Sequence, residues 1–310
     1  MGACAAVSGS WGLRAAGVLV GLDILEALDG LQWLRTGEEV SSRFAISQPT
    51  VTRYCRKVLS LFDLKLQRVD GEWQLLGDTT LLQLERRVHQ LARWQGLRPL
   101  RLEATYWSAS TYCSALPEGW LLGPSDIVGV QRNFELLQQR IVDVWVAGLP
   151  DLPTAEQPDL TAMVLSRMPV FFTCAPHHPL LERRHLHFSD LAEFPTLALP
   201  PGSYPQVEQA LKRIGLWNDA VRMTRYRRDK WEGRTEEELV IGYGTPLSMR
   251  VSGQSLCRLP LELPFRSGDA VVTRAEFHDH PRVAALLDLL RNRLKELAKD
   301  DPEIEVIAAP

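Results

Sequence analysis

The first strongly patterned stretch of the chain carries apolar residues at helical spacing from about residue 15 to residue 35. Thr36 and Gly37 interrupt this pattern, so we expect a helix up to that point and a loose tail over roughly the first dozen residues. A short second helix is predicted over 38–44 and, after a tight turn, a third over 47–62. A short turn between the second and third of three helices is typical of a helix-turn-helix unit.

An alternating apolar and polar run follows from Leu66 to Leu75, with Asp70-Gly71 at its centre. Asp-Gly between two such arms predicts a β-hairpin, which would form a wing behind the third helix. Asp78 and the two threonines after it can then cap a long helix. The apolar stripe of that helix predicts pairing with the same helix of a second copy. The stripe consists of Leu81, Leu84, Val88, Leu91 and Trp94.

From Leu100 onward, short apolar runs alternate with helical patterns. This alternation predicts a mostly parallel, open α/β sheet and is compatible with two lobes. The predicted strands are 100–105, 126–130, 143–147, 168–175, 196–199 and 270–272, and the predicted helices are 134–141, 204–214 and 281–298.

The composition indicates a soluble globular protein, with 45% hydrophobic and 24% charged residues, and 310 residues suffice for two or three domains. A net charge of −3 means that any affinity for DNA must come from a local basic patch. Between residues 43 and 68 six cations face Asp63 alone, a local excess of five. The cations are Arg43, Arg53, Arg56, Lys57, Lys65 and Arg68.

Five scattered cysteines with no Cys-x-x-Cys pair favour a reducing, cytoplasmic setting over a disulfide framework. The N-terminal apolar stretch is a poor match to a signal peptide, because its pattern continues into the first helix. No segment approaches the roughly 20 apolar residues of a membrane span, so we expect no membrane partner.

The start of the third helix supplies the candidates for DNA contact. Ser47 can cap the helix and Pro49 is tolerated in its first turn, where N–H groups lack intrahelical partners. Glutamine and arginine can read adenine and guanine edges, and threonine methyl groups can contact thymine. The residues placed to do so are Gln48, Thr50, Thr52, Arg53 and Arg56. Arg68 on the wing would position the protein on phosphate or in the minor groove; an ordinary solvated face is the alternative.

These elements together resemble a LysR-type transcriptional regulator over nearly the whole chain. The resemblance is carried by residues 44–53, 61–62 and 66–68 in the first part, and by 176–180, 189–191, 201–203, 241–246 and 280–283 in the second. It implies a winged helix-turn-helix over 1–77, a dimerising linker helix over 78–97 and a two-lobed effector domain of periplasmic-binding-protein type over 98–310. Lobe I would take about 98–175 and 266–298, and lobe II about 176–265. It also implies a homodimer or homotetramer whose position on DNA changes when a small molecule binds between the lobes.

Four hydroxyl residues near predicted strand ends are candidates for effector contact: Ser108, Ser110, Ser203 and Thr245. Hydroxyls and helix N-terminal N–H groups suit an anion or a carboxylate, although each residue could equally be a helix cap. Trp107 lies beside the expected cleft and could line it.

No metal, cofactor or catalytic centre is predicted. His177, His178, His185 and His187 lie near Cys174 but match no standard zinc spacing, and neither Gly-x-Ser-x-Gly nor a phosphate-binding loop occurs. The sequence therefore predicts a regulator that binds double-stranded DNA sequence-specifically under control of a small-molecule effector. The alternative is a ligand-binding or enzymatic α/β protein whose winged helix serves protein contacts.

Overall fold

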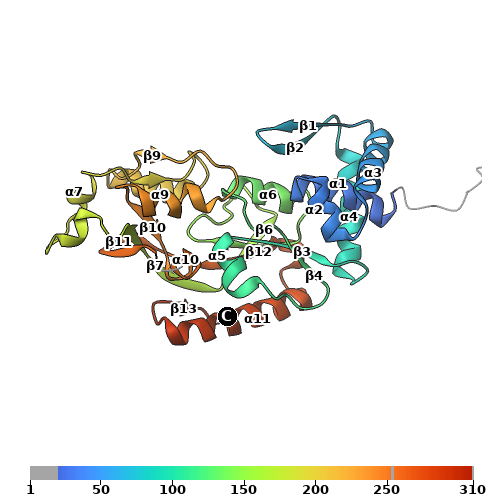
Figure 1. Cartoon of the computed structure of the whole chain (residues 1–310). Coiled ribbons are helices and arrows are strands. Elements are labelled where there is room, and N and C mark those ends of the chain that lie inside the picture. The colour runs from blue at the N-terminus through green and yellow to red at the C-terminus, as the bar shows by residue number, and fades with distance from the viewer. Residues whose placement is uncertain (1–19, 253–254, 309–310) are drawn as a thin grey trace, which may run out of the picture. The chain divides into compact units, whose positions relative to one another are not determined.

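The computed structural model describes residues 20–252 and 255–308, and its contacts divide the chain into two units, Met1–His89 and Gln90–Pro310 (Figure 1). The predicted tail and the first residues of the predicted first helix lie outside the described residues. The first unit contains α1 (Leu22–Leu34), α2 (Gly37–Phe44), α3 (Gln48–Leu61), β1 (Lys65–Val69) and β2 (Glu72–Leu76). Helix α4 (Thr80–Trp94) continues through the boundary into the second unit.

The strands of the second unit are β3 (Leu100–Ala104), β4 (Trp120–Leu122), β5 (Val144–Gly148), β6 (Leu160–Val164), β7 (Ser166–Cys174), β8 (Leu197–Ala198), β9 (Asp219–Ala220), β10 (Gly242–Gly244), β11 (Cys257–Ser267), β12 (Asp269–Arg274) and β13 (Glu305–Val306). Its helices are α5 (Tyr106–Ser108), α6 (Val130–Gln138), α7 (Phe188–Leu191), α8 (Pro205–Arg213), α9 (Glu232–Glu237), α10 (Pro246–Ser252) and α11 (Pro281–Asp300). A π-helical turn over Ala109–Cys113 follows α5 directly.

The helix-turn-helix forms where the local signals predict it. Thr36 caps α2 by accepting a hydrogen bond from the N–H of Glu39, and Ala45 ends α2 in the left-handed conformation with φ 52°. Ser47 then caps α3 through the N–H of Thr50 at 3.4 Å. On the inner face of α3, Val51 and Val58 are 2% and 0% exposed. The end of α2 at Ala45 and the cap of α3 at Ser47 thus set the limits of the turn between the two helices.

The hairpin of β1 and β2 turns at Asp70 and Gly71, whose φ angles of 50° and 84° are those of the tight turn that Asp-Gly favours. Trp73 connects the hairpin to the end of α1, because its indole N–H donates to the Arg35 carbonyl at 2.7 Å. The Arg35 guanidinium in return donates to the Gly71 carbonyl at 3.2 Å. These bonds hold the wing against the helices.

The second unit has a mixed sheet rather than the mostly parallel one that the sequence predicts. The strand order is β4-β3-β5-β12-β6; β3 is parallel to β4 and β5, but β12 is antiparallel to β5 and β6. The second sheet, β10-β7-β11, is antiparallel throughout. The difference arises because the chain enters and leaves the second sheet between neighbouring strands of the first, so β12 returns in the opposite direction. We call the part built on the first sheet lobe one and the part built on the second sheet lobe two.

The chain crosses between the lobes twice, at Leu165 and at Gly268, and the two crossings lie side by side. The N–H of Leu165 donates to the Asp269 carbonyl at 2.8 Å, and the N–H of Asp269 donates to the Ser166 hydroxyl at 3.1 Å. A Cβ atom on Gly268 would lie 2.0 Å from the Ser166 carbonyl oxygen, so only glycine fits here. The first crossing falls where β6 ends and β7 begins.

One predicted strand, 126–130, is absent from the described structure. Its residues form only an isolated bridge between Ile127 and Arg225, and Val130 already begins α6. The strand beside β3 is instead β4, which the sequence reading missed. Residues 126–128 lie between the lobes and contribute to the cavity described below.

Candidate functional sites

The outer face of α3 presents the residues predicted to contact DNA. Gln48, Pro49, Thr52, Arg53 and Arg56 are all exposed. The buried residues of α3 are Val51, Cys55 and Val58, so none of the exposed five is needed for the core. This face therefore has polar side chains available for a partner.

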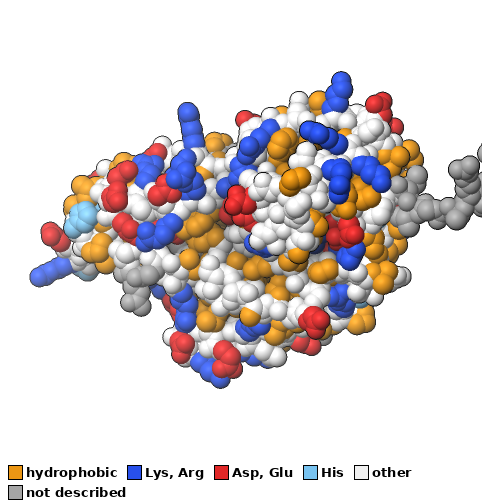
Figure 2. Space-filling model, turned by 45° about the vertical axis from the view of Figure 1, so that its right-hand side comes forward, with side chains coloured by type: hydrophobic (Ala, Val, Ile, Leu, Met, Phe, Trp, Pro, Cys, Tyr) orange, Lys and Arg blue, Asp and Glu red, His pale blue; other side chains and the backbone are white. Residues whose placement is uncertain are grey.

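Three of the predicted DNA contacts have local roles as well. The Ser47 and Thr50 hydroxyls lie 2.9 Å apart and form the cap of α3 together. On the wing, exposed Arg68 donates to the Gly71 carbonyl at 3.3 Å and lies over the Trp73 ring at 5.8 Å. Lys and Arg side chains are prominent in the upper right of Figure 2.

Helix α4 has an apolar stripe that is exposed in the described structure. Leu81, Leu84, Val88 and Leu91 are 41–62% exposed and recur at intervals of three and four residues. This is the spacing of a two-helix seam. Trp94 does not continue the stripe as predicted, because it is 4% exposed and stacks on Phe277 with ring centroids 4.6 Å apart.

The opposite face of α4 carries buried charges on both sides of the unit boundary. In the first unit, Arg86 pairs with Asp29 of α1 at 2.8 Å, with side chains 0% and 1% exposed. In the second, Arg93 donates to both carboxylate oxygens of Asp143, at 2.8 and 2.9 Å. Each unit thus holds its own part of the helix by a desolvated ion pair.

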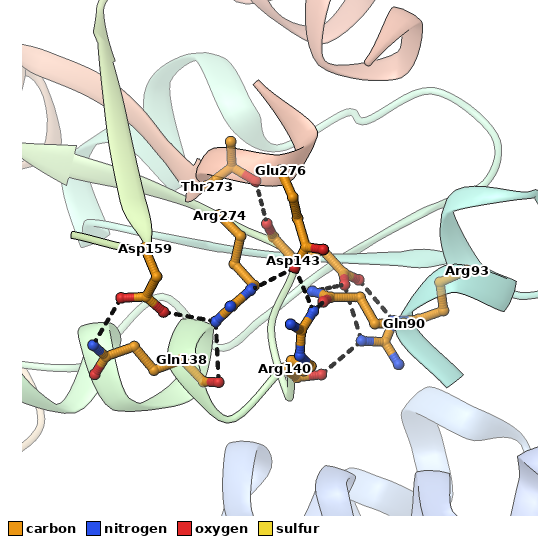
Figure 3. Close-up of polar contacts among 9 residues, drawn as sticks. All are labelled: Gln90, Arg93, Gln138, Arg140, Asp143, Asp159, Thr273, Arg274 and Glu276. Atoms are coloured by element: carbon orange, nitrogen blue, oxygen red, sulfur yellow. Dashed lines mark hydrogen bonds and ion pairs between the residues drawn. The ribbon is translucent and has the colours of Figure 1, made fainter. Parts of the chain in front are cut away.

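Asp143, at the start of β5, is the centre of the larger polar network in Figure 3. Besides Arg93 it accepts from the Gln90 amide at 3.0 Å, and Gln90 accepts from Arg140 at 2.6 Å. Arg140 continues the network to Glu276 at 2.7 Å. The last two turns of α4 are therefore bonded to the start of the central strand of the lobe-one sheet.

A cavity of about 110 Å³ lies between the two lobes of the second unit. This volume is close to that of an engineered apolar cavity, about 150 Å³, that binds benzene. Aromatic side chains dominate its wall, and among the described residues lining it the one charged side chain is that of Asp126. The aromatic lining residues are Tyr106, Trp107, Tyr204, Tyr226, Trp231, Tyr243 and Phe265.

Two tyrosines and a buried glutamate join the lobes beside this cavity. The rings of Tyr106 from lobe one and Tyr226 from lobe two stack with centroids 3.6 Å apart and planes at 4°. Both phenols donate to the Glu232 carboxylate, at 3.2 and 2.6 Å. Burial is the main cause that raises the pKa of Glu232 above its usual value. Aromatic stacking and two hydrogen bonds thus hold the cleft in a closed arrangement.

Asp126 is already neutralised by an ion pair across the same cleft. Its carboxylate lies 2.7 Å from the Arg225 guanidinium, and its carbonyl accepts from the N–H of Tyr226. The N–H of Val128 likewise donates to the Thr224 carbonyl at 3.1 Å. These bonds form the isolated bridge that replaces the predicted strand at 126–130.

A second acidic residue of lobe one reaches the N-terminus of α8 in lobe two. The Asp151 carboxylate accepts from the N–H groups of Gln206 at 2.7 Å and Val207 at 3.3 Å. These are N–H groups of the first helical turn, which have no partner within the helix. Asp151 is 3% exposed, and burial raises the pKa of its carboxyl group. The chain therefore fills this anion-binding position with its own carboxylate.

The four predicted effector residues do not come together. Only Thr245 lines the cavity, where it also forms the cap of α10 with Ser248. Ser108 is fully buried and donates to Asp269 at 2.9 Å. Ser110 is exposed and donates to the Tyr106 carbonyl, and Ser203 lies in the loop before α8 without lining the cavity. Three of the four hydroxyls therefore lie outside the cavity wall.

Sequence reasoning missed most of the aromatic wall, apart from Trp107. Glycine at 148 accounts for the position of that indole, since a Cβ atom there would lie 2.9 Å from the ring. The indole N–H donates to Asp269 at 3.0 Å, and burial raises the pKa of Asp269 to about 6. Tyr226 and Trp231 lie in irregular chain around a short 3₁₀ turn, where no periodicity distinguishes a wall residue from a core residue.

The histidine-rich stretch has a structural explanation. His178 is buried, accepts from the N–H of Leu180 at 3.2 Å and packs against Phe194. Over residues 20–252 and 255–308, no group of three or more His, Cys, Asp and Glu side chains is arranged to hold a metal. In the same part of the chain, no helix combines the length and the apolar character needed to cross a bilayer.

Two compact units, a winged helix-turn-helix and a two-lobed α/β unit with a cavity between its lobes, are the architecture of a DNA-binding regulator with an effector-binding domain. The family model described as the LysR substrate binding domain matches residues 127–295, more than half of the chain. The chain belongs to the LysR-type transcriptional regulators, which are DNA-binding proteins with an effector-binding domain and not enzymes. The predicted family is thereby confirmed.

Similar solved structures share this fold at low sequence identity. Full-length OxyR from Pseudomonas aeruginosa aligns with a TM-score of 0.55 and 16% identity, over 88% of this chain and 94% of that one. A probable transcriptional regulator from Pseudomonas aeruginosa aligns with a TM-score of 0.54 and 15% identity, over 88% and 97%. Full-length CbnR in complex with its target DNA gives a TM-score of 0.51 and 14% identity, over 88% and 100%. No curated protein sequence matches the chain.

Proposed function

We propose that this regulator reads operator DNA with the N-terminal half of α3 and that a small molecule in the interlobe cavity controls it. The observation that supports DNA binding is the exposed polar surface of α3. Its side chains do not belong to the buried core of the unit: Gln48, Thr52, Arg53 and Arg56. Arginine and glutamine there would read base edges, while Ser47, Pro49 and Thr50 would set the start of the helix against the DNA backbone. Arg68 would add a phosphate or minor-groove contact from the wing.

The exposed stripe of α4 is the proposed dimer contact. Four apolar side chains at two-helix spacing would be covered by the same stripe of a second copy. Two recognition helices held this way would meet major-groove faces about 34 Å apart. We accordingly propose the division 1–77 for DNA binding, 78–97 for dimerisation and the remainder for effector binding, in a protein that acts on DNA in the cytoplasm.

For control by an effector, the ligand must bind one arrangement of the subunits better than another. The aromatic cavity, with Thr245 in its wall, supports this role because its two lobes are joined by contacts that a ligand can alter. Gly148 at the end of β5 lines the cavity, so a shift of β5 would reach Asp143, which precedes this strand, and through it the end of α4.

Gln48→Ala tests the DNA part of the proposal. A randomised duplex library enriched on the wild-type protein supplies the specific probe, and an unenriched duplex of equal length supplies the nonspecific one. At fixed salt, Gln48→Ala should lower the ratio of specific to nonspecific affinity. The corresponding loss in the difference between the two binding free energies is about 1–3 kcal/mol. The thermal unfolding of the protein should stay unchanged.

Gln95→Ala is the matched control, since Gln95 is exposed just beyond α4 and belongs to the second unit. It should leave the ratio as in the wild type. If Gln48→Ala also preserves the full ratio, α3 does not read the operator through this residue. A protein-contact role for the winged helix would be favoured if neither duplex bound even at low salt.

A further inference from the structure

The chemistry of the cavity wall selects the charge of its ligand. No Lys, Arg or His occurs among the described residues that line it, and its one carboxylate, on Asp126, is already paired with Arg225. A carboxylate ligand would lose its hydration on entering this space and would find no cation to replace it. The same pairing leaves no free carboxylate in the wall to attract a cation.

The N-terminus of α8 would be the remaining anchor for an anion, and it is occupied. Asp151 accepts the N–H groups of Gln206 and Val207, and Val207 itself lines the cavity. Burial raises the pKa values of two neighbouring wall phenols, Tyr204 and Tyr243, and the charge of Asp151 adds a smaller contribution to both. An anion at this end of the cavity would therefore be repelled by the Asp151 carboxylate, which is bonded to Val207 in the wall.

The size and lining of the cavity point to a compact ring. About 110 Å³ bounded by tyrosine, tryptophan and aliphatic side chains is room for a single aromatic ring with a small substituent. Thr245 and Ser248 offer hydroxyl groups in the wall, so one neutral polar substituent can be oriented.

We propose that the effector of this protein is a small, uncharged aromatic molecule, and that Asp151 excludes aromatic carboxylates from the cavity. This inference rests on the effector site proposed above. It differs from the expectation from the sequence that hydroxyl groups here serve an anion.

Three probes of nearly equal shape test the charge directly: benzyl alcohol, benzoate and benzylammonium, titrated at pH 7.5 into the full-length protein by calorimetry. Benzyl alcohol should bind. Benzoate and benzylammonium should each bind at least about tenfold more weakly, because each would bury a charge that has no partner in the cavity wall. Equal or tighter binding of benzoate or benzylammonium overturns the proposed ligand class while leaving a ligand site in place. Absence of binding by all three overturns the inference, whereas operator discrimination by Gln48, measured separately, is unaffected.

Asp151→Asn tests the excluding residue. The substitution keeps an acceptor for the α8 N–H groups but removes the charge, so the affinity of benzoate relative to benzyl alcohol should rise by about threefold or more. Asp159→Asn is the control, since Asp159 pairs with Arg274 and does not line the cavity. An unchanged ratio in Asp151→Asn refutes the role of Asp151; if this variant fails to fold, the wild-type titrations still decide the ligand class.

Discussion

Asp269 offers a test of the packing where the chain crosses between the lobes, because it is a fully buried carboxylate beside the second crossing. Its carboxylate accepts hydrogen bonds from the Trp107 indole at 3.0 Å and from the Ser108 hydroxyl at 2.9 Å. Both donors are neutral, so they only partly offset the cost of burying the charged form. Its pKa is accordingly raised to about 6 from the ordinary value of 3.8. That difference corresponds to about 3 kcal/mol between the protonated and ionised forms.

The sign follows from where the proton is held. Between pH 3.8 and about 6 the folded protein keeps a proton on Asp269 that the unfolded chain has released. The contribution of Asp269 to the free energy of unfolding is therefore fully present below the pKa of the carboxyl group in the unfolded chain. It is lost as the pH rises through the pKa of the same group in the folded protein. Asp269→Asn stays neutral at every pH and can still accept both hydrogen bonds, so it should not show this loss.

The assay is urea denaturation of wild type and Asp269→Asn from pH 4 to pH 8, with the free energy of unfolding compared at each pH. The difference in favour of Asp269→Asn should grow with pH by roughly 2–3 kcal/mol and level off above about pH 7. Asp279→Asn is the control, because that side chain is 98% exposed, and its difference from wild type should stay flat. A difference for Asp269→Asn that is independent of pH, or that grows toward acid, refutes the argument.

Three further substitutions test the contacts that hold the elements in place. Trp73→Phe removes the indole N–H that donates to the carbonyl of Arg35 at the end of α1. It should lower the free energy of unfolding of the first unit, measured by urea titration, by about 1 kcal/mol or more. An unchanged value would contradict the anchoring of the wing by this bond. Asp143→Ala leaves the buried Arg93 guanidinium without the carboxylate that pairs with it. It should lower the free energy of unfolding by about 3–5 kcal/mol in the same assay. A loss below about 1 kcal/mol would mean that the ion pair does not hold α4. Leu84→Glu should shift the sedimentation coefficient toward the monomer, whereas Leu239→Glu, at an exposed leucine outside α4, should not; equal behaviour of the two variants rules out the α4 seam.

The first unit was predictable because its signals are local. The capping role of Ser47 and the turn at Asp70-Gly71 each depend on a few neighbouring residues, and both occur as expected. Trp94 shows the limit of such patterns. Its spacing fits the α4 stripe, but it packs on Phe277, a residue far along the chain that periodicity cannot reveal.

The cavity was much less predictable, because its wall comes from contacts between distant segments. Ser108 sits at a strand end as expected, yet its hydroxyl is bound to Asp269, 161 residues away. The run at 126–130 has the composition of a strand, but its N–H and C=O groups pair with residues 224–226 across the cleft. Tyr106 and Tyr226 likewise meet only after the two lobes form. The fold class thus follows from residue patterns, whereas the ligand-facing side chains follow from how the lobes close.

The most direct test of the central claim, that α3 and its basic surroundings bind DNA, is the salt dependence of duplex binding by the wild-type protein. Each phosphate contacted in the complex contributes a slope of about −0.9 to a plot of log affinity against log salt. With six cations between residues 43 and 68 of each chain, a dimer should give a slope of about −4 or steeper. A slope near zero, or no measurable binding to duplex DNA at low salt, would contradict the account and leave the winged helix as a protein-contact module.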